Sequence, residues 1–214
     1  MSPPRPAPAA VADASFASQC LSEFLARVRR VDPHPAVLDL GVLCGANIAF
    51  LGLKGCRVSV ESLPRAPAVK APAALVKQEK KPGEGAVAAP PTPLPPLSYP
   101  PDSFSGVLAW DAISRMPSAE ATAFVETLRK LLLSGGAILA YFPGPPGISS
   151  GPAGRYRIMS EDRLAVEPSK ERSLPQTAYQ NREIYALFSR FEVVRLSHLK
   201  SGTREVLVAK SRRV

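Results

Sequence analysis

The chain has 214 residues, of which 45% are hydrophobic and 24 are proline, and its formal net charge is +9. This length and hydrophobic content predict one folded domain and exclude a chain that is disordered throughout. The N-terminus lacks the apolar core of a signal peptide, and no run approaches the roughly 18 apolar residues of a membrane helix. The three cysteines form no C-x-x-C motif, which favours reduced thiols over a disulfide frame or a zinc site. We therefore expect a soluble, cytoplasmic protein that enters no membrane and holds no metal.

Proline sets the predicted domain limits, because it lacks a backbone N–H and fixes φ. Residues 1–12 read as a disordered Pro/Ala-rich tail, and residues 211–214 as a short basic tail. Between them, residues 13–210 are predicted to form a single domain that contains a Pro-rich loop at about 64–97.

A helix is predicted from about Asp13 to Val31. Phe16, Cys20, Phe24 and Val28 recur every four residues and mark one apolar face. The Asp32-Pro33 pair ends the pattern, because the residue before a proline is disfavoured in helices. This helix is expected to cover one face of a sheet.

The stretch from Val37 to Gly45 organises the rest of the domain. It is predicted to be a buried strand that runs into a glycine-bearing turn, followed by a short helix from about Asn47 to Leu53. A second apolar strand, Arg57–Glu61, ends on a carboxylate. Strand, glycine turn, helix, strand and terminal acid is the order by which open α/β folds build a nucleotide cleft at the carboxyl ends of their strands. Asp39 and Glu61 are the acidic side chains at that edge.

Further elements alternate along the remaining sequence. A strand is expected at Gly106–Trp110, just before Asp111, and a helix with Ser118 as its N-cap ends at Gly135-Gly136. The other expected elements are a strand at Ala137–Phe142, a helix at Asn181–Arg190, and strands at Phe191–Leu196 and Glu205–Ala209 joined by a turn at Lys200–Thr203. The predicted fold is α/β: a Rossmann-like, mostly parallel sheet flanked by helices, with a C-terminal antiparallel hairpin.

In this order the motifs resemble the class I methyltransferases that use S-adenosylmethionine, in particular their type 11 branch. The resemblance runs through most of residues 35–210. The matching passages are Val37-Leu-Asp-Leu-Gly-x-x-x-Gly45, Val58-Ser-Val-Glu61, Pro100-Pro-Asp-Ser-Phe-Ser-Gly-Val-Leu-Ala-Trp110, Leu128–Gly136 with the strand after it, and the closing hairpin.

The resemblance implies S-adenosylmethionine as cofactor and gives each candidate residue a role. Glu61 would accept both ribose hydroxyls, a bidentate contact suited to a carboxylate. Asp39 would lie near the amino-acid end of the cofactor, with Gly41 and Gly45 letting the backbone approach it. Trp110 would face the transferred methyl group, and Asp111 beside it is the candidate base or orienting group.

The first motif is degenerate, because position 43 is leucine where the family has its middle glycine. The Leu43 side chain would either point into the methionine pocket or force the loop outward. The segment after Glu61 also replaces, with Pro/Ala/Lys sequence, the strand that the family uses beside the adenine. A misplaced Cβ of this kind costs a few kcal/mol, roughly ten- to several-hundred-fold in affinity, so weak or lost cofactor binding is predicted.

Two hypotheses therefore stand side by side. One is a methyltransferase acting on an unidentified acceptor. The other is an inactive methyltransferase-shaped module for protein interaction, in which Asp39 caps the turn, Glu61 is a solvated strand end and Trp110 belongs to the core. A nicotinamide dinucleotide fits worse, because it needs glycine at positions 43 and 46, which are leucine and alanine. Nucleic-acid binding is a weaker third alternative that rests on the positive charge alone.

Overall fold

A six-stranded sheet forms the centre of the molecule in the computed structural model, which describes residues 14–62, 97–144, 154–168 and 176–212. The strands follow the order β3-β2-β4-β5-β9-β8. The first four are parallel to one another, and β9 is antiparallel to both of its neighbours. The predicted mostly parallel sheet with a terminal antiparallel hairpin is thereby confirmed. The strands are β2 (Ala36–Asp39), β3 (Arg57–Val60), β4 (Phe104–Trp110), β5 (Leu132–Phe142), β8 (Glu192–His198) and β9 (Arg204–Ala209).

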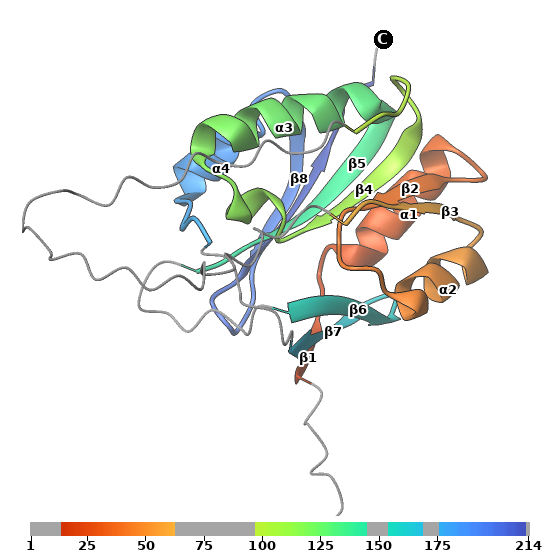
Figure 1. Cartoon of the computed structure of the whole chain (residues 1–214), viewed down its shortest axis with the longest axis horizontal. Helices are drawn as coiled ribbons and strands as arrows, with labels where there is room; N and C mark the ends of the chain where they lie inside the picture. The colour runs from red at the N-terminus through yellow and green to blue at the C-terminus, as the bar shows by residue number, and fades with distance from the viewer. Residues whose placement is uncertain (1–13, 63–96, 145–153, 169–175, 213–214) are drawn as a thin grey trace, which may run out of the picture.

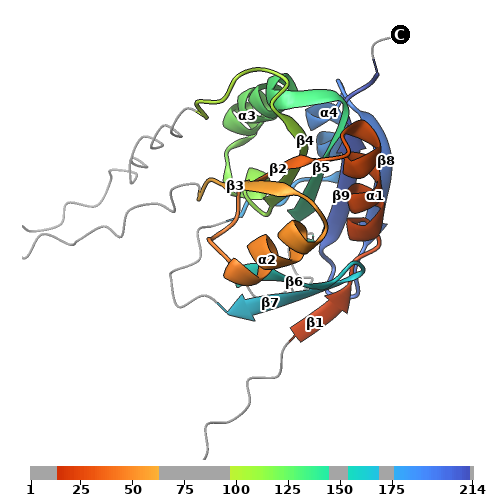
Figure 2. The ribbon, with the colours of Figure 1, turned by 90° about the vertical axis from the view of Figure 1, so that its right-hand side faces the viewer.

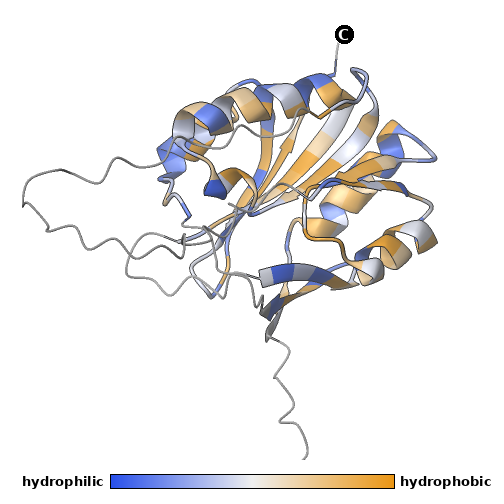
Figure 3. Ribbon diagram, viewed as in Figure 1, coloured by the Kyte–Doolittle hydropathy of each residue, from blue (hydrophilic) through white to orange (hydrophobic). Residues whose placement is uncertain are grey.

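Helices cover both faces of this sheet. α3 (Ser118–Leu131) and α4 (Asn181–Leu187) lie on one side, and α1 (Leu21–Val31) and α2 (Gly45–Leu53) lie on the other (Figure 1). Successive strand residues point to opposite faces, so Leu38 packs in the core beneath α3 while Val37 packs in the core beneath α1. Apolar residues line both interfaces between the sheet and the helices (Figure 3). The result is a three-layer α/β domain with the sheet buried on both faces.

A second, three-stranded antiparallel sheet lies beside α2, with the order β1-β7-β6 (Figure 2). Its strands are β1 (Ala14–Ala17), β6 (Gly154–Ser160) and β7 (Arg163–Pro168). The sequence analysis did not foresee this sheet, although Tyr156 and Ile158 alternate with arginines as a half-buried strand requires. Its strand β6 contacts Asn47 of α2 and Trp110 of β4.

The predicted helix from Asp13 to Val31 is wrong at its start. Residues 14–17 form β1, which pairs with β7, and the helix begins only at Leu21. Phe16 fits the four-residue spacing by coincidence, because a strand pairing distant in sequence overrides the local pattern. The N-cap of α3 is Pro117 rather than Ser118, and this helix ends at Leu131, where β5 follows directly and contains Gly135 and Gly136.

The C-terminal elements match the prediction closely. The hairpin turn lies between β8 and β9, and α4 ends at Leu187, a few residues before the expected Arg190. The predictions for residues 1–12, for nearly all of the Pro-rich loop at 64–97 and for the last two residues of the basic tail concern positions outside the described residues. Within the described residues, no helix is long and apolar enough to cross a membrane.

Candidate nucleotide site at the carboxyl edge of the sheet

Three of the predicted site residues meet at one edge of the sheet. β2 lies between β3 and β4, and all three strands run in the same direction. Asp39 ends β2, Glu61 directly follows β3, and Trp110 ends β4. The Glu61 amide donates a hydrogen bond to the backbone oxygen of Asp39 (2.9 Å), which ties the two strand ends together. The structure therefore assembles the edge at which open α/β folds bind ligands.

Asp39 is buried, with 1% of its surface exposed. Its Oδ1 accepts hydrogen bonds from the Gly41 amide (2.8 Å) and from Trp110 Nε1 (2.6 Å). Burial raises the pKa of this carboxyl, and the hydrogen bonds from Trp110, Gly41 and Asn47 partly offset the rise. Through these two hydrogen bonds, Asp39 fixes the glycine turn and holds the Trp110 indole against it.

The indole of Trp110 covers the face of the turn at Gly41. A Cβ built on Gly41 would lie 2.7 Å from Trp110 Cδ1 and 2.8 Å from its Nε1, closer than real Cβ contacts come. The side chain is almost fully buried, and the residue adopts φ of +47°, an unusual value for a bulky residue. The space that a side chain on residue 41 would need is thus filled by the Trp110 indole.

Two tyrosines continue the stack that begins at Trp110. The ring of Tyr156 lies 5.1 Å from that of Trp110 at an interplanar angle of 12°. The ring of Tyr141 in turn lies 5.0 Å from that of Tyr156, at 26°. Burial is the main cause that raises the pKa of both phenols, so both rings stay neutral at physiological pH. Such stacked pairs contribute about 0.5–1.5 kcal/mol each beyond area burial.

Asn47 fastens the small sheet over the glycine turn. This residue lies in α2 and is buried, with 1% of its surface exposed. Its amide nitrogen donates to the Tyr156 carbonyl (3.0 Å), and its oxygen accepts from the Ile158 amide (2.8 Å). The side chain thus pairs the Tyr156 carbonyl and the Ile158 amide of β6, as a neighbouring strand would. Polar Asn47 within the otherwise apolar segment Gly45–Leu53 was the sequence signal for this contact, and the sequence analysis missed it.

Leu43 and Gly45 leave the turn open to solvent, whereas Glu61 and Asp111 already have side-chain partners. The Leu43 side chain is 60% exposed, so it does not point inward to where a methionine pocket was expected. A Cβ at Gly45 would meet nothing within 4 Å. Glu61 accepts a hydrogen bond from the Tyr99 hydroxyl (2.7 Å), which is the main cause that raises the pKa of Tyr99. Asp111 forms an ion pair with Arg115.

The residues at this edge do not fit S-adenosylmethionine as they lie. A cofactor of this class needs the bare backbone of the glycine turn, and Trp110 covers that backbone at Gly41. The carboxylate expected to bind the ribose already accepts the Tyr99 hydroxyl. In the described part of the chain, no group of three or more His, Cys, Asp or Glu side chains could hold a metal ion.

A buried carboxylate that the sequence analysis did not single out lies behind the tyrosine stack. Glu205 on β9 is fully buried and accepts hydrogen bonds from the amides of Gln19 (2.8 Å) and Cys20 (3.2 Å) and from the Tyr141 hydroxyl (2.5 Å). It also receives the hydroxyl of Ser18. The carboxylate lies at the N-terminus of α1, where unpaired amides and the helix dipole favour negative charge. Its role here is to anchor that helix end.

Comparison with known proteins gives no family membership. No family model matches the chain, and no curated protein is similar to it. A solved SAM-dependent methyltransferase from Methanosarcina mazei is similar over 84% of this chain and 93% of its own, with 16% identity and a TM-score of 0.48. For the 1,6-didemethyltoxoflavin-N1-methyltransferase of Burkholderia thailandensis, the shares are 91% and 79%, the identity 17% and the TM-score 0.47. An amino pentose methyltransferase from Micromonospora echinaspora is similar over 89% of this chain and 90% of its own, with 14% identity and a TM-score of 0.43.

By its own strand order and layers, the chain is a Rossmann-like α/β protein. Its methyltransferase-like features are the sequence motifs, and those that contain Asp39, Glu61 and Trp110 meet at the carboxyl edge of β2, β3 and β4.

Proposed function

We propose that this chain is a methyltransferase-shaped module that acts through binding and does not transfer a methyl group, because its own Trp110 occupies the nucleotide site. The observation that carries this proposal is the position of the Trp110 indole, which lies 2.7 Å from the point that a Cβ on Gly41 would occupy. The Pro-rich composition of residues 64–97 and the net charge of +9 fit a protein that contacts other macromolecules.

The energy needed to open the site supports this proposal. Removing the indole from its place sacrifices its burial, its stacking on Tyr156 and its hydrogen bond to Asp39. Truncating a buried Phe or Trp to alanine, which removes packing contacts of this kind, costs about 3–5 kcal/mol. An opening cost of about 4 kcal/mol lowers the apparent affinity about a thousandfold, because only the open fraction binds. A cofactor site that is micromolar when open would therefore behave as a roughly millimolar site.

A methyltransferase acting on an unidentified acceptor is the second candidate, and one observation favours it. Trp110 holds φ of +47°, and strained backbone of this kind gathers at functional sites and switches. In this alternative, Trp110 and the hairpin β6–β7 move aside and expose Asp39 and Gly41, while Glu61 exchanges Tyr99 for the ribose hydroxyls. The nucleic-acid alternative has only the net charge in its favour.

Calorimetric titration with S-adenosylmethionine and S-adenosylhomocysteine separates the two candidates. For the wild-type chain we expect no binding at micromolar ligand, because the closed site has at most roughly millimolar affinity. We expect Trp110→Ala to gain measurable binding, and Trp110→Phe to stay silent because it keeps a ring over Gly41. Since Leu43 is solvent-exposed, Leu43→Gly should not change the result.

Micromolar binding by the wild-type chain would overturn the proposal. If that binding disappeared in Glu61→Ala but persisted in Glu192→Ala, an exposed carboxylate on β8, the enzymatic alternative would hold. Nucleic-acid binding would make retention of the chain on heparin fall steeply with salt. Retention that does not respond to salt would therefore count against the nucleic-acid alternative.

A further inference from the structure

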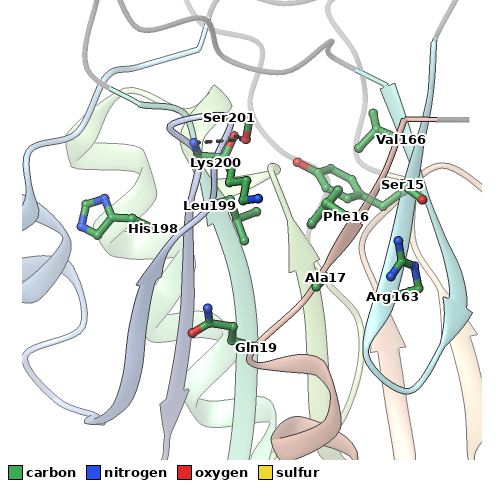
Figure 4. A pocket seen from close by; sticks show the side chains of 12 residues that line it. Ser15, Phe16, Ala17, Gln19, Arg163, Val166, His198, Leu199, Lys200 and Ser201 are labelled. Carbon is green, nitrogen blue, oxygen red and sulfur yellow. Dashed lines mark hydrogen bonds between the residues drawn. The ribbon is translucent and has the colours of Figure 1, made fainter. Parts of the chain in front are cut away.

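A cavity separates the small sheet from the turn between β8 and β9. Its volume is about 530 Å³. Phe16 and Ser15 of β1 and Val166 of β7 line one side, and Leu199 and Lys200 of the turn line the other (Figure 4). Small-molecule sites in proteins span roughly 300–1,000 Å³. The cavity therefore has the size of a binding site, and it lies apart from the glycine turn.

The lining combines an apolar floor with positive charge. Phe16, Tyr156, Val166 and Leu199 supply the apolar surface. The 12 lining residues include Arg163 and Lys200 but no Asp or Glu. The His198 side chain points away from the gap in Figure 4. This combination suits a ligand with an apolar body and one anionic group.

Neither cation is neutralised within the described residues. Most arginines of the small sheet and its surroundings form ion pairs, as Arg155 and Arg157 do with Glu167. Among the described residues, by contrast, the side chains of Arg163 and Lys200 have no ion pair and no hydrogen bond. The lining of the cavity thus includes two cations that an anion could pair with.

We propose that this cavity binds a small amphipathic carboxylate, with its hydrocarbon part against Phe16, Val166 and Leu199 and its carboxylate between Arg163 and Lys200. The proposal does not depend on whether the nucleotide site is closed. It connects to that site through Tyr156, which lines the cavity and stacks on Trp110. Since Trp110 is the single tryptophan of the chain, its emission reports on events in the cavity.

The test compares three probes of equal chain length: octanoate, octanamide and octylammonium. Calorimetry on the full chain should show saturable, sub-millimolar binding of octanoate. Octanamide should bind at least tenfold more weakly, and octylammonium should not bind at all. The emission of Trp110 should change along the same octanoate saturation curve.

Arg163→Gln combined with Lys200→Gln should weaken octanoate binding at least tenfold and leave the melting temperature unchanged, because both side chains are exposed. Lys130→Gln, an exposed cation on α3, is the matched control and should bind like the wild type. Ala17→Phe, which places a ring in the cavity, should abolish binding of octanoate and octanamide alike.

Several results would overturn the proposal: no saturable binding of octanoate, equal affinity for octanamide, or full binding by the Arg163/Lys200 double variant. Binding that leaves the Trp110 emission unchanged would place the ligand elsewhere and would also overturn it. Titration with S-adenosylmethionine has no bearing on these outcomes, so failure of this proposal and failure of the proposed function can be told apart.

Discussion

Substitution of Gly41 by alanine tests the central contact of the structure without any ligand. The new methyl group would lie 2.7 Å and 2.8 Å from two atoms of the Trp110 indole and 2.9 Å from Asp39 Oδ1. Since φ of Gly41 lies outside the left-handed region, the backbone itself admits alanine. The penalty therefore comes from overpacking, which costs about 1–3 kcal/mol. In a domain of this size, that corresponds to a fall of roughly 2–12 °C in melting temperature.

A double-mutant cycle with Trp110→Ala shows where the penalty arises. Urea unfolding followed by circular dichroism gives the free energy of unfolding of the wild type, both single variants and the double variant. With the indole removed, Gly41→Ala should cost less than half of its effect in the wild type, which gives a coupling energy of about 1–2 kcal/mol. Trp110→Leu replaces Trp110→Ala should the latter unfold. Gly45→Ala is the control within the same turn, because its Cβ would meet nothing within 4 Å.

The reasoning fails if Gly41→Ala changes the free energy of unfolding by less than about 0.5 kcal/mol, the range of neutral surface substitutions. It also fails if the cost is the same with and without the indole. The first result would mean that Trp110 lies away from the glycine turn in solution. The second would assign the cost to Asp39 Oδ1 rather than to the indole.

Three further predictions concern the packing around this edge. Gly106→Ala should lower the free energy of unfolding by about 1–3 kcal/mol, because its Cβ would lie 2.6 Å from side-chain atoms of α1. The control is Gly52→Ala, whose Cβ would meet nothing within 4 Å and which should be neutral or stabilising in the same urea assay. Asn47→Ala should lower the free energy of unfolding by about 1–3 kcal/mol for each backbone group of β6 that it leaves unpaired. It should also speed amide hydrogen exchange in residues 154–160, and unchanged exchange there would contradict the role given to this side chain. In the folded protein, burial raises the pKa of the Asp39 carboxyl above its ordinary value of 3.8. The folded state therefore holds the carboxyl proton more tightly than the unfolded state does. The cost of the buried charge thus grows as pH rises above about 3.8, and the stability difference between Asp39→Asn and wild type should shift in favour of the variant between about pH 3 and pH 7; the opposite trend would refute the direction of the shift.

The central sheet could be predicted because its signals are local. The buried strands before Asp39 and Asp111 are continuous apolar runs, and α3 carries a clear helical stripe between turn residues. The ends of elements were less certain, as the start of α1 shows, because β1 forms only by pairing with a strand some 150 residues later in the chain.

The candidate site could be predicted in part. The sequence identified the residues of the carboxyl edge but not how they face one another. A leucine in a glycine motif suggested a steric obstacle at position 43, yet the side chain over the turn is Trp110, which reaches it through an uncommon backbone angle and a hydrogen bond to Asp39. Such an arrangement depends on tertiary contacts from β6, and local propensity carries no information about them.

The position of β9 has a consequence for the biosynthesis of the protein. The strand nearest the C-terminus lies inside the sheet between β5 and β8, and its Glu205 completes the start of α1. On the ribosome, the long central strand β5 therefore keeps one edge unpaired until β9 has emerged. A premature stop before residue 204 would leave this edge open to pairing with other chains, so we expect such fragments to aggregate rather than to survive as shortened proteins.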